Sequence, residues 1–555
     1  MTLGPRFRED DYAGSGPHKS AVMDDLQTHT WKRAIDHARL AERGRAVVKL
    51  DGRQLALFAV GDRIYACNNR CPHQGYPLVE GSISKDASRC LLTCQWHNWQ
   101  FDLDNGANRY RGDVLRVYPT RVIDGAVWVD VSDPPAAERI ERARHALREA
   151  FDDNETDRIA RELARLRKFG ADPARAVADA INWTHERFED GFTHAYAAAA
   201  EWLRWYDERP GDADLQLTAL LEAIGHLAYD SLRAPRYPYT EKTSEYSEKR
   251  FLAAIEAQDE DRAIALARGA LAGDLRFADL QRVLATAALS HYTGFGHGLI
   301  YVLHAGQLID RLGTDVETTL LLGLVRFLTR ARREDLVPEF RPYAAALAAW
   351  PTSPAGGTAP APEHFAGQSI KAALTAVVDA VHASSNESLF HSLLGAAALQ
   401  LARFDERWGR SDSENPAHDV DWLDLTHAVT FAHAARVLCS KWPQLWPQAL
   451  LQIALFLGRN TEYTDAALPI AASTDDAFER LGDEFIADHG VGLYIFSAHR
   501  LKTWRAAREE LAAGLPDDIA ALLRAGVARF VAAPLRERHV RRTVRQARSF
   551  VALED

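Results

Sequence analysis

Long hydrophobic runs are missing from this chain of 555 residues. No window approaches the roughly eighteen consecutive apolar residues that a membrane-spanning helix requires. Residues 1–30 also lack the apolar stretch of a signal peptide. We therefore expect a cytoplasmic protein with no membrane partner, in which residues 1–30 form a mobile N-terminal tail.

An excess of positive charge is missing as well. The chain has 66 Lys and Arg against 77 Asp and Glu, which gives a formal net charge of -11. The basic residues are scattered along the sequence and form no stripe or cluster. Proteins that neutralise a phosphate backbone need such a cluster, so we do not expect nucleic acid as a partner.

Cysteine is scarce, with five residues in the whole chain. This number excludes the disulfide framework of a small secreted protein. Four of the five nevertheless crowd into one short region, at Cys67, Cys71, Cys90 and Cys94. Such crowding in a cysteine-poor chain indicates a metal site.

The pattern of the sequence changes once, near Asp133-Pro134-Pro135. Before it, from about residue 46 to residue 131, short β-type runs alternate with Asp-Gly, Gly-Asp and Asn-Gly turn signals. After it, the chain is rich in Ala, Leu, Arg and Glu with apolar residues spaced three and four apart, which is typical of helices. The chain is also longer than one compact core. We predict a small antiparallel all-β domain at 31–132 and a large all-α domain at 140–555.

The β region contains a pair of mixed ligand motifs, Cys71-x-His73 and Cys94-x-x-His97. Each motif offers one sulfur and one nitrogen ligand. Structural zinc sites are usually built from pairs of like ligands, whereas a 2Fe-2S cluster with two cysteines on one iron and two histidines on the other needs this mixture. A 2Fe-2S cluster is therefore favoured, and a zinc site is the alternative.

The motifs "CPHQG" and "CQWHNWQFD", the Asn-Gly turn after them and the segment "LRVYPTRVIDGAVWVDV" resemble the Rieske 2Fe-2S proteins over residues 31–131. The resemblance implies that Cys71, His73, Cys94 and His97 hold the cluster, which carries one electron at a time. Some Rieske proteins join the two loops by a disulfide, but this chain has Tyr76 and Gln95-Trp96 at those places, so it resembles the ferredoxin and oxygenase type. Cys67 and Cys90 are expected to be buried strand residues, with a disulfide between them as the alternative.

Histidine is unevenly distributed, since 16 of the 21 lie beyond residue 140. Several occupy apolar helical stretches, where a merely solvated side chain is not expected: His291, His297, His304, His391, His427, His433 and His499. Considered alone, each of them is expected to be a core histidine that forms a hydrogen bond with a backbone carbonyl or a carboxylate. Their recurrence in separate helices favours a metal site, because helix bundles build such sites from facing helices.

The segments "GHGLIYVLHA", "THAVTFAHA" and "AHRLKTW" resemble motifs of the questin oxidase-like family, which is helical and associated with oxidative opening of aromatic polyketide rings. The resemblance implies a mononuclear non-haem iron held by His297, His427, His499 and Lys502 as a carbamate, with His194 of "FTHAYAAAAEW" as a further ligand. An N-terminal Rieske module departs from this family. For Lys502 the alternative is a snorkelling side chain on an amphipathic helix. Tyr292, Tyr301, Phe295 and Trp504 would shape an aromatic pocket or belong to the core.

Together these observations predict a Rieske-coupled non-haem iron oxygenase that acts on an aromatic or polycyclic small molecule. A reductase or ferredoxin would donate the electrons, because the chain has no dinucleotide-binding fingerprint of its own. The alternative is a Rieske ferredoxin-type electron-transfer protein with a metal-free, partner-binding helical domain. Iron content separates the two, at about three irons per chain for the oxygenase and about two for the carrier.

Overall fold

A computed structural model describes residues 31–86, 89–231, 235–292, 294–332, 340–352, 356–408, 421–486 and 493–533, with residues 544, 547, 548 and 550–552 near the C-terminus. The expected tail at 1–30 lies outside the described residues. The chain divides into two compact units, which are described separately: the β unit, Met1–Arg142 with Ser549–Asp555, and the helical unit, Ala143–Arg548.

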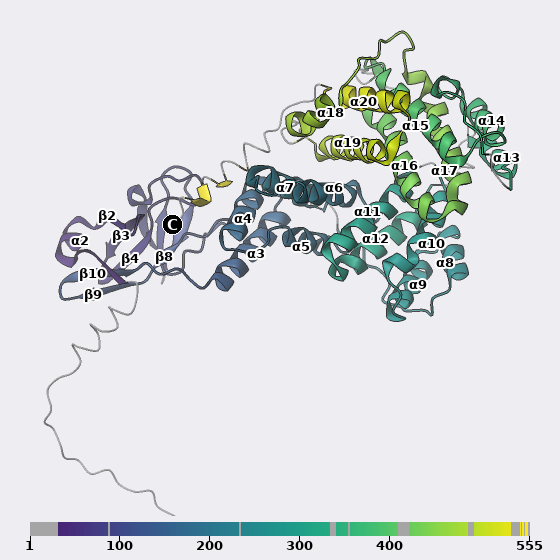
Figure 1. The fold of residues 1–555 in the computed structure, drawn as a ribbon. Coiled ribbons are helices and arrows are strands. Elements are labelled where there is room, and N and C mark those ends of the chain that lie inside the picture. Colours follow the sequence, from purple (N-terminus) through teal and green to yellow (C-terminus); the bar gives the residue numbers. More distant parts are fainter. Residues whose placement is uncertain are drawn as a thin grey trace, which may run out of the picture. The chain divides into compact units, whose positions relative to one another are not determined.

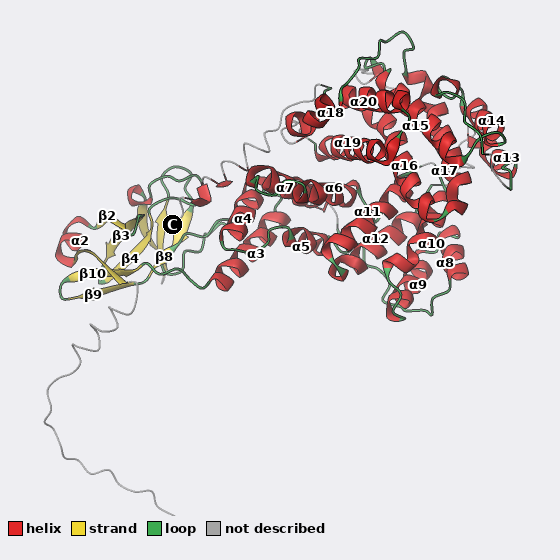
Figure 2. Cartoon of the chain, viewed as in Figure 1, coloured by secondary structure: helices red, strands yellow, loops and turns green. Residues whose placement is uncertain are grey.

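The β unit contains three small antiparallel sheets (Figure 2). Their strand orders are β1-β10-β9, β2-β3-β4-β8 and β5-β6-β7. One short helix, α2 (His37–Arg43), follows β1 and ends at Gly44, whose left-handed backbone conformation suits a residue without a side chain. The strands are β1 (Trp31–Asp36), β2 (Arg45–Leu50), β3 (Arg53–Val60), β4 (Arg63–Asn68), β5 (Ser82–Asp86), β6 (Arg89–Thr93), β7 (Gln100–Asp102), β8 (Val117–Tyr118), β9 (Thr120–Ile123) and β10 (Ala126–Asp130).

Two apolar clusters form the core of the β unit. One contains Leu55, Leu57, Val127 and Val129, which lie two residues apart and so point to one face of β3 or of β10. The other contains Phe58, Leu92, Phe101 and Leu115 together with Cys67, Cys71, Cys90 and Cys94. This second cluster therefore contains all four cysteines of the β unit, together with side chains of β4 and β6.

The helical unit is built from helices joined by loops (Figure 1). Among the described residues beyond Asp130 there is no strand, apart from an isolated bridge between Phe404 and Thr464. The helices are α3 (Ala136–Asp152), which begins in the β unit, α4 (Thr156–Lys168), α5 (Arg175–Trp183), α6 (His194–Asp207), α7 (Ala213–Ser231), α8 (Glu248–Glu256), α9 (Glu260–Ala272), α10 (Phe277–Leu289), α11 (His297–Leu312), α12 (Glu317–Thr329), α13 (Pro342–Ala348), α14 (Ile370–Val381), α15 (Asn386–Ala402), α16 (Trp422–Lys441), α17 (Trp446–Asn460), α18 (Asp475–Leu481), α19 (Tyr494–Gly514) and α20 (Asp517–Val531).

Four of these helices close a ring around a common centre. Helix α6 packs against α11 and α19, and α16 packs against the same two helices from the other side. Buried residues cover most of the surface of α6, α16 and α19, since each also packs on outer helices such as α7, α17 and α20. Of the histidines in the ring, His427 and His499 are buried, and His194 and His297 are partly buried.

The predicted fold class is confirmed, with an antiparallel β unit followed by a large helical unit. The interpretation of Cys67 and Cys90 as buried strand residues is confirmed too. They lie in β4 and β6, and both thiols are free, so the alternative disulfide is not formed. No helix in the described part of the chain has the length and apolar character needed to cross a membrane.

Candidate metal centres

Cys71 and Cys94 begin two loops of the same backbone design. In the first loop the N–H of Cys71 donates to the carbonyl of Tyr76 (2.9 Å) and the N–H of Gly75 donates to the carbonyl of Cys71 (2.7 Å). In the second loop Cys94 pairs in the same way with Trp99 (2.8 Å) and Asn98 (2.9 Å). The fifth residue of each loop, Gly75 or Asn98, has a positive φ of 79° or 60°, which glycine and asparagine tolerate best.

The twin loops bring the two imidazoles together beside the two thiols. The ring centroids of His73 and His97 are 4.7 Å apart, and Trp99 stacks on His73 at 4.3 Å. Tyr76 and Trp96 are also in ring contact across the loops, at 5.7 Å, in the places where some Rieske proteins have a disulfide. The loops are thus joined by aromatic contacts.

The electrostatics of the thiols fit a bound cation cluster. Burial, together with the neighbouring Cys94, raises the pKa of Cys71 to about 12, although hydrogen bonds from the backbone N–H groups of His73 and Gln74 oppose this shift. Two adjacent thiolates therefore need positive charge to coexist, and the iron ions of a cluster supply it. The donor set of two sulfurs, two imidazoles and inward-pointing N–H groups fits a 2Fe-2S cluster. His97 is exposed, so this edge reaches the surface.

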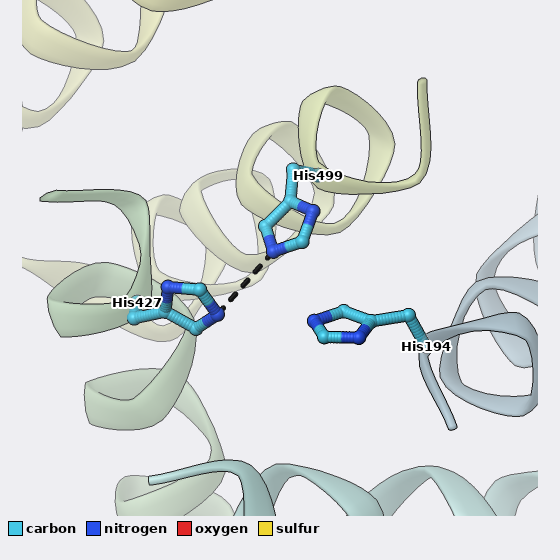
Figure 3. A group of neighbouring side chains, drawn as sticks. All are labelled: His194, His427 and His499. Atoms are coloured by element: carbon cyan, nitrogen blue, oxygen red, sulfur yellow. Dashed lines mark hydrogen bonds between the residues drawn. The ribbon is translucent and has the colours of Figure 1, made fainter. Parts of the chain in front are cut away.

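The helical unit brings four of the predicted ligand histidines together. His194 and His297 are the first residues of α6 and α11. His427 and His499 lie in the second turns of α16 and α19. Each residue comes from a different helix of the ring, and Figure 3 shows three of them, His194, His427 and His499, pointing toward one another.

The four imidazoles form a closed quadrilateral. Centroids of consecutive rings, in the order His194, His297, His427, His499, are 4.6, 4.5, 5.0 and 4.9 Å apart. The Nε2 atom of His297 is 2.9 Å from that of His194 and 3.0 Å from that of His427, which is 3.3 Å from that of His499. Imidazole nitrogens bind a metal at roughly 2 Å, so two of them on adjacent positions of one ion lie about 3 Å apart. The observed spacing fits a single metal ion.

Backbone hydrogen bonds fix the tautomer of three of these rings. Nδ1 of His297 lies 2.5 Å from the carbonyl of Gly294, Nδ1 of His427 lies 2.6 Å from that of Leu423, and Nδ1 of His499 lies 2.7 Å from that of Ile495. A carbonyl oxygen only accepts, so each Nδ1 carries the proton.

In a neutral ring the Nε2 atom then has a lone pair and no proton. The three Nε2 atoms of His297, His427 and His499 therefore face one another as acceptors. This arrangement needs a cation between them.

The environment keeps the four rings neutral. Burial, together with the ammonium of Lys502, lowers the pKa of His297 to about 4. Burial also lowers the pKa of His194, His427 and His499 well below the usual value, helped by Lys502 and by the neighbouring rings. Protonated imidazolium is thus disfavoured as the missing cation, which leaves a metal ion.

Lys502 lies one turn after His499 on α19 and is buried, with 3% of its surface exposed. Burial lowers the pKa of its ammonium to about 7, while the charge of Glu201 raises it. A fully buried lysine does not fit the snorkelling alternative, which requires the charged end to reach water. Its neutral amine is accessible near neutral pH, as carbamate formation would require.

The start of α11 is strained where it presents His297. Phe295 has a positive φ of 53°, and Gly296 follows with 72°. A Cβ atom on Gly296 would lie 2.3 Å from the ring of Phe431 on α16, so only glycine fits this close approach. A bulky residue in the left-handed region costs roughly 1–3 kcal/mol, and such strain is concentrated at functional sites.

The other singled-out histidines do not join the four. Nε2 of His304 lies 3.1 Å from Glu201, Nδ1 of His433 lies 2.6 Å from Glu510, and Nε2 of His291 lies 2.9 Å from Glu256. These three histidines pair with carboxylates, as expected for core histidines that are not metal ligands. His391 is half-buried on α15, and burial lowers its pKa.

Two of the four expected pocket aromatics border the site. The hydroxyl of Tyr301 is 3.3 Å from Nδ1 of His194, and the ring of Phe295 is 5.9 Å from that of His427. Trp504 instead donates its indole N–H to the carbonyl of Phe478, and the hydroxyl of Tyr292 donates to the carbonyl of Phe340, so both are core residues.

The sequence interpretation missed Glu201, which lies seven residues after His194 and so on the same face of α6. This buried carboxylate pairs with His304 and with Arg505 of α19. An isolated glutamate within the alanine-rich segment "AYAAAAEW" was the available signal.

Comparison with known proteins agrees with the geometry of the β unit. Residues 30–117 match the Rieske [2Fe-2S] domain family. The chain is 30% identical over 115 residues to the ferredoxin component of the alkene monooxygenase system of Xanthobacter autotrophicus, covering 20% of this chain and 80% of that protein. The chain therefore belongs to the Rieske [2Fe-2S] proteins through its N-terminal residues.

Other similar proteins match this chain over a smaller part of their own length. The 4beta-methylsterol monooxygenase of Methylococcus capsulatus is 31% identical over 113 residues, which is 18% of this chain and 29% of that protein. The terminal oxygenase of carbazole 1,9a-dioxygenase from Nocardioides aromaticivorans is 26% identical over 19% of this chain and 31% of that chain, with a TM-score of 0.17. These similarities cover the β unit, and the questin oxidase-like resemblance of the helical unit stays a prediction.

Proposed function

We propose that the protein is a Rieske-coupled non-haem iron oxygenase, in which residues 31–132 carry electrons and residues 140–555 form the catalytic domain. Cys71, His73, Cys94 and His97 would hold the 2Fe-2S cluster. His194, His297, His427 and His499, with Lys502 as a carbamate, would hold a mononuclear iron. A separate reductase or ferredoxin would reduce the cluster, and an aromatic or polycyclic small molecule would be the substrate.

One observation carries this proposal above the others. Unprotonated Nε2 atoms of His297, His427 and His499 meet at 3.0 and 3.3 Å inside a closed ring of helices. Three lone pairs at this spacing, largely shielded from solvent, repel one another unless a cation lies between them. Imidazole ligands suit an iron ion, which would supply dioxygen binding and activation when bound there.

The residues of the chain contribute three things to such a site. Carbonyls of Gly294, Leu423 and Ile495 hold the imidazoles in the tautomer that presents Nε2. Tyr301 orients His194 through Nδ1. The surrounding helices keep water from the buried Lys502 and thus favour the amine that a carbamate requires.

Similarity to oxygenase components supports the redox half of the proposal. The Xanthobacter relative is described as a ferredoxin component of an alkene monooxygenase, and the Methylococcus relative as a sterol monooxygenase. In this chain a Rieske domain is joined to a helical unit with its own candidate metal site. The simplest role for the two parts is that the Rieske cluster delivers electrons to the metal site of the helical unit in the same protein.

Metal quantification with low-temperature electron paramagnetic resonance tests the proposal. We expect about three irons per chain, as a 2Fe-2S signal and a separate mononuclear signal, against about two for the electron-carrier alternative. His427→Ala and His499→Ala should each remove one iron and leave the visible absorption of the cluster unchanged.

His291→Ala is the matched control, because His291 pairs with Glu256 outside the site. It should retain all the iron, and circular dichroism should show that all three variants keep their helices. Full iron content in both ligand variants would refute the assignment of the second site.

A further inference from the structure

The geometry points to Arg459 as a positioning residue that holds His297 at the distance from His427 that a shared metal ion needs. Arg459 lies in the last turn of α17 and acts through two neighbours, the ring of Phe295 and the carboxylate of Asp424. The inference rests on the proposed function and deepens it by naming the side chain that keeps two of the ligand positions together.

The backbone turn before α11 determines where the imidazole of His297 points. The φ angle is 53° at Phe295 and 72° at Gly296. The carbonyl of Gly294 accepts hydrogen bonds from the backbone N–H of His297 (3.1 Å) and from its Nδ1–H (2.5 Å). A change in this turn would therefore move the whole ring, including the Nε2 atom that lies 3.0 Å from Nε2 of His427.

The left-handed conformation of Phe295 needs support from outside the turn. Glycine adopts a positive φ freely, so Gly296 is unstrained, whereas a phenylalanine is strained there. A strained residue keeps its conformation only where its surroundings hold it. The guanidinium of Arg459 lies over the ring of Phe295, with Cζ 3.9 Å from the ring centroid, which is within the range of a cation–π contact. Arg459 therefore holds the strained side chain in place.

The same guanidinium also binds the start of α16. Nη2 of Arg459 donates to Oδ1 of Asp424 at 3.2 Å. Oδ2 of Asp424 accepts from the backbone N–H of Asp421, also at 3.2 Å, as part of the capping box that begins α16. His427 follows Asp424 by three residues, which is almost one helical turn. Arg459 thus connects the turn that presents His297 with the turn that presents His427.

The simpler interpretation of Arg459 and Asp424 is an ordinary surface ion pair. Such pairs contribute little when both charges are well solvated. Here the two side chains are 26% and 22% exposed, and the guanidinium contacts an aromatic ring and a carboxylate at the same time. A planar, forked guanidinium suits this double contact better than the compact ammonium of a lysine does. The arrangement is therefore suited to fixing the relative positions of α11 and α16.

Binding of Co²⁺ to the full-length chain tests the inference. A chelator first removes the mononuclear metal under conditions that leave the visible absorption of the cluster unchanged, and Co²⁺ is then titrated by calorimetry. Arg459→Met and Phe295→Leu, alone and combined, remove the two sides of the cation–π contact. Arg311→Met is the matched control, because Arg311 lies in the last turn of α11 and pairs with Asp207. His427→Ala is the variant without the site.

We expect Arg459→Met to bind Co²⁺ about tenfold more weakly than the wild type, as is typical for the loss of a residue that orients a metal ligand. Phe295→Leu should lose a similar amount, and the combined variant should lose no more, because both changes remove the same contact. Asparagine tolerates a positive φ better than phenylalanine, so adding Phe295→Asn to Arg459→Met should restore the affinity about fivefold. Arg311→Met should bind like the wild type, and circular dichroism should show intact helices in all variants.

Three results would overturn the inference alone: wild-type affinity in Arg459→Met, additive losses in the combined variant, or no recovery on adding Phe295→Asn. Should Arg459→Met fail to fold, wild-type affinity in Phe295→Leu would have the same meaning. A wild-type chain that binds no Co²⁺ at a site sensitive to His427→Ala would overturn the proposed function, and this inference with it.

Discussion

Replacement of His433 by glutamine should destabilise the helical unit in a pH-dependent manner without removing iron. His433 is buried between two carboxylates, with Nδ1 2.6 Å from Glu510 and Nε2 3.3 Å from Glu509. Both ring nitrogens face acceptors, so both carry protons and the ring is an imidazolium. Glutamine can donate to one of the carboxylates but brings no charge.

The magnitude follows from the pKa of His433, which its two carboxylates raise from 6.5 to about 9 against the opposing effect of burial. A raised pKa stabilises the folded state fully below pH 6.5, and this contribution is lost as the pH rises through 9. The difference corresponds to about 3 kcal/mol. The variant should therefore be less stable by about that amount near pH 6, and by much less near pH 9.5.

Urea unfolding followed by far-UV circular dichroism, at both pH values, measures this difference. His291→Gln is the control, because its pair with Glu256 lies near the surface and should contribute well under 1 kcal/mol. Iron content of His433→Gln should equal that of the wild type. A stability loss of the same size at both pH values would refute the buried imidazolium and leave only a packing effect.

Three further predictions concern the metal centres. Gly296→Ala would place a Cβ 2.3 Å from Phe431, so quantification should show one iron fewer per chain with the cluster retained. Cys94→Ala should abolish the visible absorption of the cluster and keep about one iron. Since the pKa of Lys502 is about 7, a carbamate signal in carbon NMR under labelled carbon dioxide should strengthen from about pH 6 to 8 and vanish in Lys502→Met. Unchanged iron content in Gly296→Ala or unchanged visible absorption in Cys94→Ala would contradict the assignment of the corresponding metal centre. A carbamate signal that persists in Lys502→Met would contradict the assignment of the carbamate to Lys502.

The sequence predicted the β unit well because its signals are local. Asp-Gly and Asn-Gly pairs specify hairpin turns, and a cysteine and a histidine within four residues specify a loop that holds both ligands. The repeated backbone design of the two loops was not foreseen, although Gly75 and Asn98 are both residues that favour a positive φ. Each loop could be interpreted alone, but their pairing through Trp99 on His73 depends on the folded sheets.

The division into an antiparallel β unit and a helical unit was predicted from turn chemistry and periodicity. What periodicity could not supply was the closed ring of α6, α11, α16 and α19, because spacing along one helix does not say which helix faces it. Glu201 was missed for this reason. Its partners, His304 and Arg505, lie more than one hundred residues away in the chain.

The contrast between His304 and His427 shows where sequence reasoning stops. Each occupies an apolar helix, and each donates Nδ1–H to the carbonyl four residues earlier, Ile300 at 2.7 Å and Leu423 at 2.6 Å. A helix thus fixes the tautomer of either residue with its own backbone and leaves Nε2 to face the neighbouring helix. For His304 the partner is the carboxylate of Glu201, which makes a neutral or charged pair complete without any ion.

For His427 the partners are the Nε2 atoms of His297 and His499. These two rings have the same tautomer, so their Nε2 atoms also lack a proton and can only accept. The backbone of the helix fixes the tautomer of the histidine. The residue that faces Nε2 from the neighbouring helix then determines whether a metal ion is required. Because that residue belongs to another helix, only the tertiary structure separates a core histidine from a candidate iron ligand in this chain. The assignment of the second site therefore depends on what each Nε2 atom faces. Burial and position in the helix do not distinguish the two kinds of histidine.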